Sequence, residues 1–135
     1  MTIILTWDDI DEMVVETVKW ITEERRIDTI FGITMGGIIP ATLIAKQLKI
    51  DNVMFIGKES IQQALRSYPI YTLVVDDISD TGETLSNVIG FGNVSVATLC
   101  VRQGTHVWPN YYGRIIKDKS WVKFPWERED EIRNK

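Results

Sequence analysis

The sequence predicts an α/β fold in which helices flank a mostly parallel central sheet. Near-continuous apolar runs alternate with segments of helical period, and strands of this kind occur in parallel sheets that are covered on both faces. An acidic cluster follows one apolar run, and a Gly-Gly breaker follows another. Because ligands bind at the carboxyl ends of parallel strands, both features are expected at one edge of the sheet.

The first helix is predicted over residues 6–24, where Thr6 or Asp8 can cap the start and apolar residues recur at helical spacing. After the breaker "MGG", residues 38–50 resume a helical pattern. The polar segment 59–69 is compatible with either a short helix or a loop. Residues 81–92 are expected to form a turn followed by a short helix.

Strands are predicted over the apolar runs at residues 28–34, 52–58, 70–77 and 94–102. The remaining segment, 105–135, is rich in aromatic residues and has no clear period. It is expected to form a cap or a sheet edge followed by a charged tail. A length of 135 residues indicates one domain.

Composition limits the classes of partner. The net charge is −4 and no basic patch stands out, which argues against nucleic acid as the main partner. A small phosphorylated ligand stays possible, because Mg²⁺ can supply positive charge. The start of the chain lacks the features of a signal peptide, and no apolar run approaches the ~20 residues of a membrane span. A single cysteine, Cys100, predicts a small core residue, no disulfide framework and a cytoplasmic location.

The stretch "VVDDISDTGET" suits a sugar that carries a 5′-phosphate. Asp76 and Asp77 can accept hydrogen bonds from the ring hydroxyls, while Mg²⁺ offsets their mutual repulsion. The phosphate needs several N–H donors that converge on one point, and the start of a helix provides them. Gly82 lets the backbone approach closely, and Thr81 and Thr84 add hydroxyl donors. The cluster places four acids within eight positions: Asp76, Asp77, Asp80 and Glu83.

Three other interpretations compete. "DDISD" matches the metal motif of isoprenoid synthases, but those are large helical proteins and this motif follows a β run. Acidic pairs also end strands in phospho-receiver domains, which lack a Gly-Thr loop after the acids; this stays a weaker alternative. The acids could also form a solvated loop in which Asp80 caps a helix. That interpretation explains single residues and not the whole set.

The same stretch resembles the ribose-phosphate motif of the type I phosphoribosyltransferases, and the order of elements agrees over nearly the whole chain. The similarity is greatest to the xanthine-guanine phosphoribosyltransferases. It rests also on the "TWDD" opening, on "GITMGGIIPATLIAKQLKI" and on the late stretch "WVKFPWE". The resemblance implies the type I phosphoribosyltransferase fold over a single domain, 1–135. In this fold a small C-terminal hood, with the tail, would cover approximately 103–135.

The resemblance also implies an enzyme that transfers ribose 5-phosphate from phosphoribosyl pyrophosphate (PRPP) to a purine and releases pyrophosphate. Asp76 and Asp77 would hold the ribose hydroxyls, with Asp77 as the contact to a Mg²⁺ cofactor. Asp80 would lie near N7 of the base as the catalytic proton acceptor. The 5′-phosphate loop would consist of Thr81, Gly82, Glu83 through its backbone N–H, and Thr84.

Two further sites are implied by the resemblance. Arg102 would recognise the 6-oxo group of the purine, Trp121 would stack on the base, and the carbonyl of Val122 would accept from its N–H groups. A cis peptide is expected before the first glycine of the pyrophosphate-binding loop. That loop would bind through backbone N–H groups and consists of Thr34, Met35, Gly36 and Gly37.

The chain departs from the pattern of the xanthine-guanine enzymes in two places. Those enzymes have an arginine where this chain has Met35, and segment 59–69 is shorter than their mobile loop. Lys58 or Arg66 could substitute for the missing charge. The resemblance predicts salvage of guanine, xanthine or hypoxanthine by a homo-oligomer, a dimer or tetramer. The two departures favour an alternative, a nucleotide- or PRPP-binding regulatory protein with little turnover.

Overall fold

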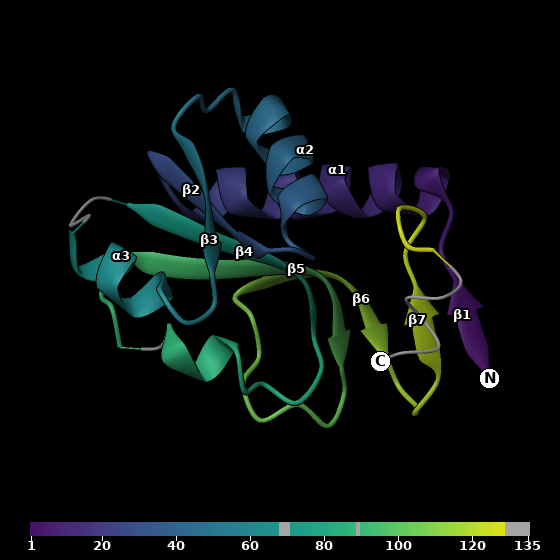
Figure 1. The fold of residues 1–135 in the computed structure, drawn as a ribbon. Helices are drawn as coiled ribbons and strands as arrows, with labels where there is room; N and C mark the ends of the chain where they lie inside the picture. The colour runs from purple at the N-terminus through teal and green to yellow at the C-terminus, as the bar shows by residue number, and fades with distance from the viewer. Residues whose placement is uncertain (68–70, 89, 129–135) are drawn as a thin grey trace.

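The computed structural model describes residues 1–67, 71–88 and 90–128 and has a five-stranded sheet at its centre. The strand order is β3-β2-β4-β5-β6, and every neighbouring pair is parallel, which confirms the predicted fold class. Figure 1 shows the sheet with helices above and below it. Its strands are β2 (Thr29–Thr34), β3 (Val53–Gly57), β4 (Thr72–Ser79), β5 (Val94–Arg102) and β6 (Tyr111–Ile116). The four predicted strands are therefore present, with small shifts at their ends.

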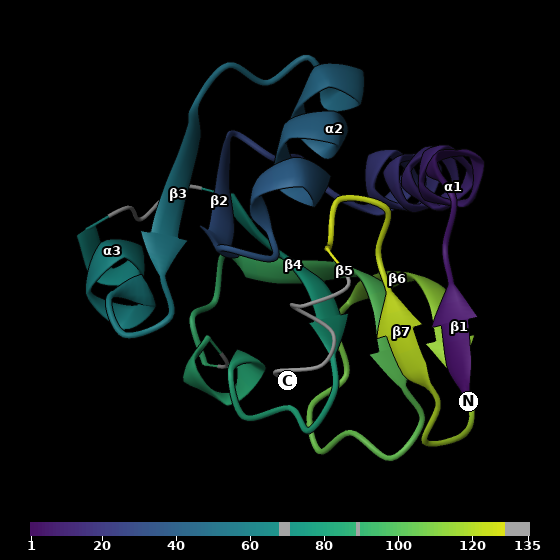
Figure 2. The same cartoon turned by 45° about the vertical axis from the view of Figure 1, so that its right-hand side comes forward.

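A second, two-stranded sheet pairs β1 (Thr2–Ile4) with β7 (Trp121–Lys123) in parallel. Figure 2 shows this pair beside the β6 side of the central sheet. The segment expected to form the hood and tail, 103–135, is thus divided: β6 joins the central sheet as an edge strand, and β7 pairs with β1. Residues 129–135 of the expected tail lie outside the described residues.

Helices α1 (Trp7–Glu24) and α2 (Ile38–Leu48) agree with the two helices predicted from the sequence. Thr6 caps α1 through a capping box: the Asp9 N–H donates to Thr6 Oγ1 at 3.1 Å, and the Thr6 N–H donates to Asp9 Oδ2 at 2.8 Å. The ambiguous polar segment forms the short helix α3 (Ile61–Ser67). The helix expected within 81–92 is a single 3-10 turn, η1 (Leu85–Asn87).

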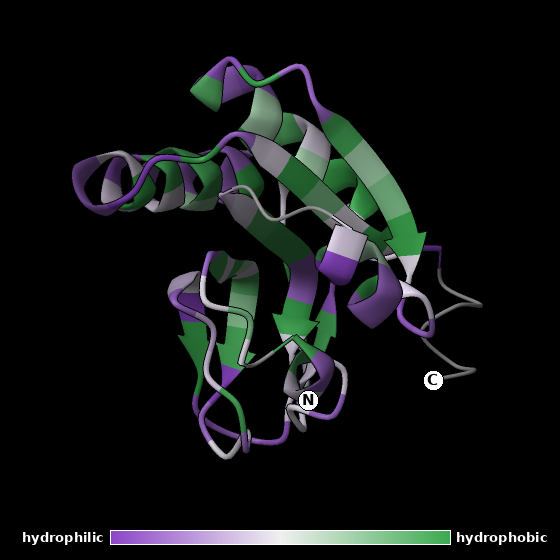
Figure 3. Cartoon of the chain, turned by 90° about the vertical axis from the view of Figure 1, so that its left-hand side faces the viewer, coloured by the Kyte–Doolittle hydropathy of each residue, from purple (hydrophilic) through white to green (hydrophobic). Residues whose placement is uncertain are grey.

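The sheet separates two hydrophobic cores. Helices α1 and α2 cover one face, and α3 and η1 cover the other (Figure 1). Figure 3 shows that the strands are mostly hydrophobic whereas many connecting loops are hydrophilic. Within the described part of the chain, no helix is both long and apolar enough to cross a membrane.

Candidate active site

The carboxyl ends of β2, β3, β4 and β5 lie at one edge of the sheet because these strands are adjacent and parallel. Thr34, the last residue of β2, pairs with Gly57, the last residue of β3. Ser79, the last residue of β4, pairs with Val101 near the end of β5. The loops that follow these strands contain most of the site residues predicted from the sequence, so the fold brings those residues to one edge.

Asp76 and Asp77 lie within β4, as the predicted strand at 70–77 implied, and the strand continues two positions further, to Ser79. The Asp77 N–H donates to Asp76 Oδ1 at 2.9 Å, and the Ile78 N–H donates to Asp77 Oδ1 at 2.8 Å. A Cβ added to Gly36 would overlap the carboxylate of Asp77. Glycine at position 36 therefore lets the predicted pyrophosphate loop lie directly against the Asp77 carboxylate.

The two adjacent carboxylates affect each other electrostatically. Burial raises the pKa of Asp76 well above its usual range, and the charge of Asp77 raises this pKa further. The positive charge of Lys58 acts in the opposite direction and lowers the pKa of Asp76. A cation placed between the two acids would relieve the same repulsion, which is the role expected of a bound metal.

The residues present fit a Mg²⁺ ion. No group of three or more His, Cys, Asp and Glu side chains suited to a metal occurs among the described residues. Mg²⁺, however, is commonly bound by one or two carboxylates together with substrate phosphates. Asp76 and Asp77 supply such a pair at the strand edge where the substrate is expected.

The predicted pyrophosphate loop, residues 34–37, has a tightly packed glycine and an exposed side chain. A Cβ on Gly37 would collide with the carbonyl oxygens of Val75 and Ile33, so only glycine fits there. The Met35 side chain is 81% exposed. The loop contains a cis peptide, but between Thr34 and Met35, one bond earlier than the position expected before Gly36.

The predicted 5′-phosphate loop is a sharp turn held against a second loop. Gly82 has a φ of +93°, and a Cβ on it would collide with the backbone nitrogen of Val107. The His106 N–H donates to the Thr81 carbonyl at 2.9 Å. The consecutive residues 78–85 line one pocket at this turn. The shape of this turn depends on the close contact between two loops that are distant in sequence.

The donors of this loop differ in part from the expectation. Because η1 is only one 3-10 turn, the helix dipole on which the prediction relied contributes little here. The Glu83 N–H donates to Thr81 Oγ1 at 3.2 Å. A phosphate would have to replace that bond to use the Glu83 N–H. The remaining donors are the other loop amides and the hydroxyls of Thr81 and Thr84.

The residues predicted to bind the purine surround one small cavity. Arg102 comes from the end of β5, Trp121 and Val122 come from β7, and Asp80 follows β4. The cavity is lined by Ile78, Asp80, Arg102, Trp121, Val122 and Phe124. The structure therefore places the predicted proton acceptor and the three predicted base contacts next to one another.

Arg102 is already engaged by protein groups. Its Nε donates to Asp80 Oδ1 at 2.6 Å, and its Nη1 donates to the carbonyls of Asp118 at 2.6 Å and Ser120 at 3.0 Å. The guanidinium thus ties the turn before β7 to the central sheet. Nη2 is the nitrogen without a bond to a described residue in these contacts, and it is the atom through which Arg102 could donate to a ligand.

The aromatic residues of "WVKFPWE" have two kinds of surroundings. Phe124 is buried and stacks on Trp126 at a centroid distance of 5.0 Å, so the expected packing role is present for both. The indole N–H of Trp121 is buried and has no hydrogen-bond partner among the described residues. Trp121 is therefore held by its strand, where its backbone N–H donates to the Met1 carbonyl at 2.9 Å.

Sequence reasoning missed a buried polar pair that supports the phosphate loop. Ser79 Oγ lies 3.0 Å from Thr105 Oγ1 and donates to the Val107 carbonyl at 2.9 Å. Both hydroxyl residues are buried. No local pattern marks this pair, because the two residues belong to different segments and meet only after β4 and β5 have paired.

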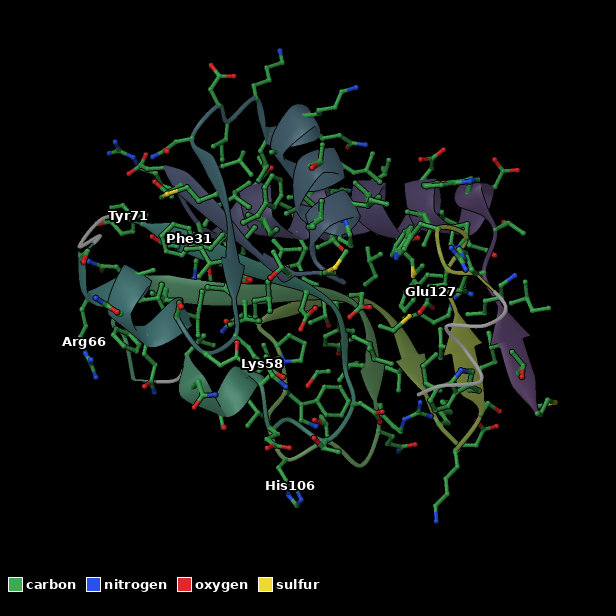
Figure 4. The ribbon with its side chains drawn as sticks, viewed as in Figure 1. Phe31, Lys58, Arg66, Tyr71, His106 and Glu127 are labelled. Atoms are coloured by element: carbon green, nitrogen blue, oxygen red, sulfur yellow. The ribbon has the colours of Figure 1, made fainter. Side chains whose placement is uncertain are left out.

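The other residues singled out from the sequence have distinct positions. Lys58 lies between β3 and η1, whereas Arg66 and His106 point outward into solvent (Figure 4). Cys100 is fully buried in β5, and burial raises the pKa of its thiol to about 12. The thiol is therefore protonated near neutral pH, as expected of a core residue.

No protein-family model matches the chain, but individual curated proteins and solved structures are similar to it. The xanthine-guanine phosphoribosyltransferase of Chromohalobacter salexigens is 29% identical over 116 residues, covering 77% of this chain and 71% of that protein. The corresponding protein of Cereibacter sphaeroides is 26% identical over 113 residues, covering 73% of this chain and 68% of that protein.

Solved structures agree. A purine phosphoribosyltransferase from Pyrococcus horikoshii superposes with a TM-score of 0.77 at 27% identity, over 94% of both chains. A Helicobacter pylori xanthine-guanine-hypoxanthine phosphoribosyltransferase has the same TM-score at 13% identity, which supports the fold alone. The chain has the type I phosphoribosyltransferase fold. Its curated homologues are xanthine-guanine phosphoribosyltransferases.

Proposed function

We propose that this protein is a purine phosphoribosyltransferase that transfers ribose 5-phosphate from PRPP to a 6-oxopurine and releases pyrophosphate. The observation that carries the proposal is the position of the base cavity. The cavity shares Ile78 and Asp80 with the pocket at the predicted phosphate loop, and Ile78 directly follows the acidic pair on β4. A base held in the cavity would therefore lie beside a ribose held by Asp76 and Asp77.

In the proposed reaction, N9 of the base forms a bond to C1′ of the ribose as the bond from C1′ to pyrophosphate breaks. Asp76 and Asp77 accept hydrogen bonds from the ribose hydroxyls and stabilise positive charge that develops at C1′. Asp80 accepts the proton that the base loses at N7. Bound Mg²⁺ would stabilise the negative charge of the departing pyrophosphate.

The ion pair with Arg102 suits the proposed role of Asp80. The Oδ1 atom accepts from Arg102 Nε, which fixes the direction of the carboxylate and leaves Oδ2 for the base. The Asp80 side chain is 54% exposed, so a proton accepted from the base can pass to solvent. The expected partners of the protein are PRPP, the purine base and Mg²⁺, in a dimer or tetramer of identical chains.

A second candidate is a nucleotide- or PRPP-binding protein with little turnover. It is favoured by segment 59–69, of which residues 61–67 form α3 and pack onto the sheet. Ile61 and Leu65 are buried in the core. A helix anchored in this way cannot close over the site as a long mobile loop would, and water exclusion would be weaker.

Incubation with PRPP, Mg²⁺ and guanine, followed by chromatography for GMP and pyrophosphate, separates the two candidates. The proposed function predicts both products in equal amounts, with the rate greatly reduced in Asp80→Asn. Binding of GMP and PRPP without either product would establish the second candidate in place of the enzyme.

A further inference from the structure

The predicted pyrophosphate loop contains no cationic side chain, although its ligand is highly anionic. Residues 34–37 are Thr, Met, Gly and Gly, and Met35 projects into solvent. The acidic pair lies directly against this loop at Gly36. A bound Mg²⁺ would offset the charge of the acids, but the loop itself offers only neutral donors to pyrophosphate.

Lys58 lies next to this loop because of the strand register. Gly57 pairs with Thr34, and a Cβ on Gly57 would lie 3.8 Å from Thr34 Oγ1. Lys58 is the next residue after this pair, so it leaves β3 beside the point where the pyrophosphate loop leaves β2. Figure 4 shows it at the end of β3, facing the side of the site where η1 lies.

Lys58 also borders the predicted phosphate loop. It lines a cavity of about 220 Å³ together with Glu59, Thr81, Glu83, Thr84 and Asn87. Two of these side chains are acidic, so without Lys58 the cavity would repel an anion. One cation therefore lies beside both predicted phosphate sites.

The ammonium group of Lys58 is available for a ligand. The side chain is exposed, and no ion pair between described residues includes it. Arg66, the other candidate from the sequence, lies in the last turn of α3 and points away from the site (Figure 4). A lysine on a flexible stem can act as a point charge toward phosphate oxygens without a fixed geometry.

We propose that Lys58 is the side chain that binds the pyrophosphate group of PRPP and so supplies the positive charge that the Thr34–Gly37 loop lacks. This assignment rests on the proposed function, since it assumes that PRPP is the ligand. It differs from a role in 5′-phosphate binding, because the 5′-phosphate has its own amide and hydroxyl donors at residues 81–84.

Calorimetric titration of Lys58→Met and Arg66→Met with PRPP, with inorganic pyrophosphate and with GMP tests the assignment in Mg²⁺. GMP carries the 5′-phosphate but no pyrophosphate. Lys58→Met should weaken PRPP and pyrophosphate binding about tenfold to a hundredfold, the range for a charge-assisted hydrogen bond, and should leave GMP binding within about twofold. Arg66→Met, the matched control, should leave all three affinities unchanged.

A rescue variant adds a second criterion. Met35→Arg should raise PRPP affinity more in the Lys58→Met background than in the unmodified protein, because the two cations serve one group. Equal losses of PRPP affinity in Lys58→Met and Arg66→Met would overturn the assignment. An equal loss of GMP and pyrophosphate affinity in Lys58→Met would also overturn it. If the unmodified protein bound neither PRPP nor pyrophosphate, the proposed function itself would be contradicted. The two outcomes above contradict only the assignment of Lys58.

Discussion

Arg102 and Asp80 form an ion pair in which Arg102 Nε lies 2.6 Å from Asp80 Oδ1, and this pair joins the ends of β5 and β4. The same guanidinium holds the carbonyls of Asp118 and Ser120, which precede Trp121. One side chain therefore determines both the direction of the proposed proton acceptor and the position of the proposed stacking residue. Changes at Arg102 should affect selectivity and base affinity together.

Gly82→Ala should destabilise the protein and weaken binding of the 5′-phosphate. A non-glycine residue at φ +93° is strained by about 1–3 kcal/mol, and the new Cβ would also collide with Val107. Urea unfolding and titration with GMP measure the two effects. Gly90→Ala is the matched control, since Gly90 has the same φ of +93° but nothing within 4 Å of an added Cβ.

The control variant should lose stability only through strain and should bind GMP normally. Equal losses of stability in the two variants would mean that the loop at 105–107 moves to accommodate the added Cβ at little cost. Unchanged GMP affinity in Gly82→Ala would remove this turn from the phosphate site.

The contact at Gly82 also illustrates what the sequence could not predict. The four main strands were predictable because each is a near-continuous apolar run, and the acidic cluster was recognisable because its residues are contiguous. The support from Thr105 and Val107 was not predictable, because no local pattern records a contact between two loops that depends on strand pairing.

The short elements were missed for related reasons. β1 and β7 have three residues each and pair only with each other, so neither has enough length to show a strand pattern. β6, "YYGRII", mixes aromatic, glycine and charged residues because it is an edge strand, and its place in the central sheet follows from pairing with β5. The helix predicted after the acidic cluster is only the single turn η1. The β-branched residues and glycines that follow η1 have low helix propensity.

Asp77→Asn should separate ligand binding from folding. The Asn side-chain oxygen can still accept from the Ile78 N–H, and removal of a charge relieves the repulsion with Asp76. We expect unchanged or higher thermal stability, while PRPP affinity in Mg²⁺ falls roughly tenfold or more because a charged contact is lost. A large drop in the melting temperature without ligand would show that the Asp77 carboxylate serves the fold.

Asp76→Asn should change how stability depends on pH in the presence of a chelator. Burial raises the pKa of Asp76 in the folded protein above its unfolded value. Between the two values the native state binds more protons than the unfolded state, so this group makes stability fall as pH rises. The variant should therefore be more stable than the unmodified protein at pH 7 to 8. The difference should vanish below about pH 4, the ordinary Asp value.

Asp9→Asn provides a control of opposite sign. Hydrogen bonds from Thr6 lower the pKa of Asp9, so its contribution to stability is present at neutral pH and is lost as pH falls through the folded value. This variant should be less stable than the unmodified protein near neutral pH and should match it in acid. If the two variants gave stability differences of the same sign, the account of the acidic pair would be wrong.

The choice of base follows from the donors and acceptors of the proposed pocket. Arg102 can only donate, and a 6-oxo group accepts, whereas adenine presents an amino donor at that position. An unpaired donor costs about 1–3 kcal/mol, and more when it is charged, so discrimination of roughly tenfold to several hundredfold is expected. Trp121 stacks on any purine face and should not discriminate.

The ratio of kcat/KM for guanine to that for adenine, measured with PRPP and Mg²⁺, tests the central claim most directly. The account predicts a strong preference for guanine in the unmodified protein and a much smaller ratio in Arg102→Ala. Trp121→Ala should lower kcat/KM for both bases and leave the ratio nearly unchanged. Equal turnover of guanine and adenine by the unmodified protein would contradict both the role of Arg102 and the assignment of 6-oxopurines as substrates.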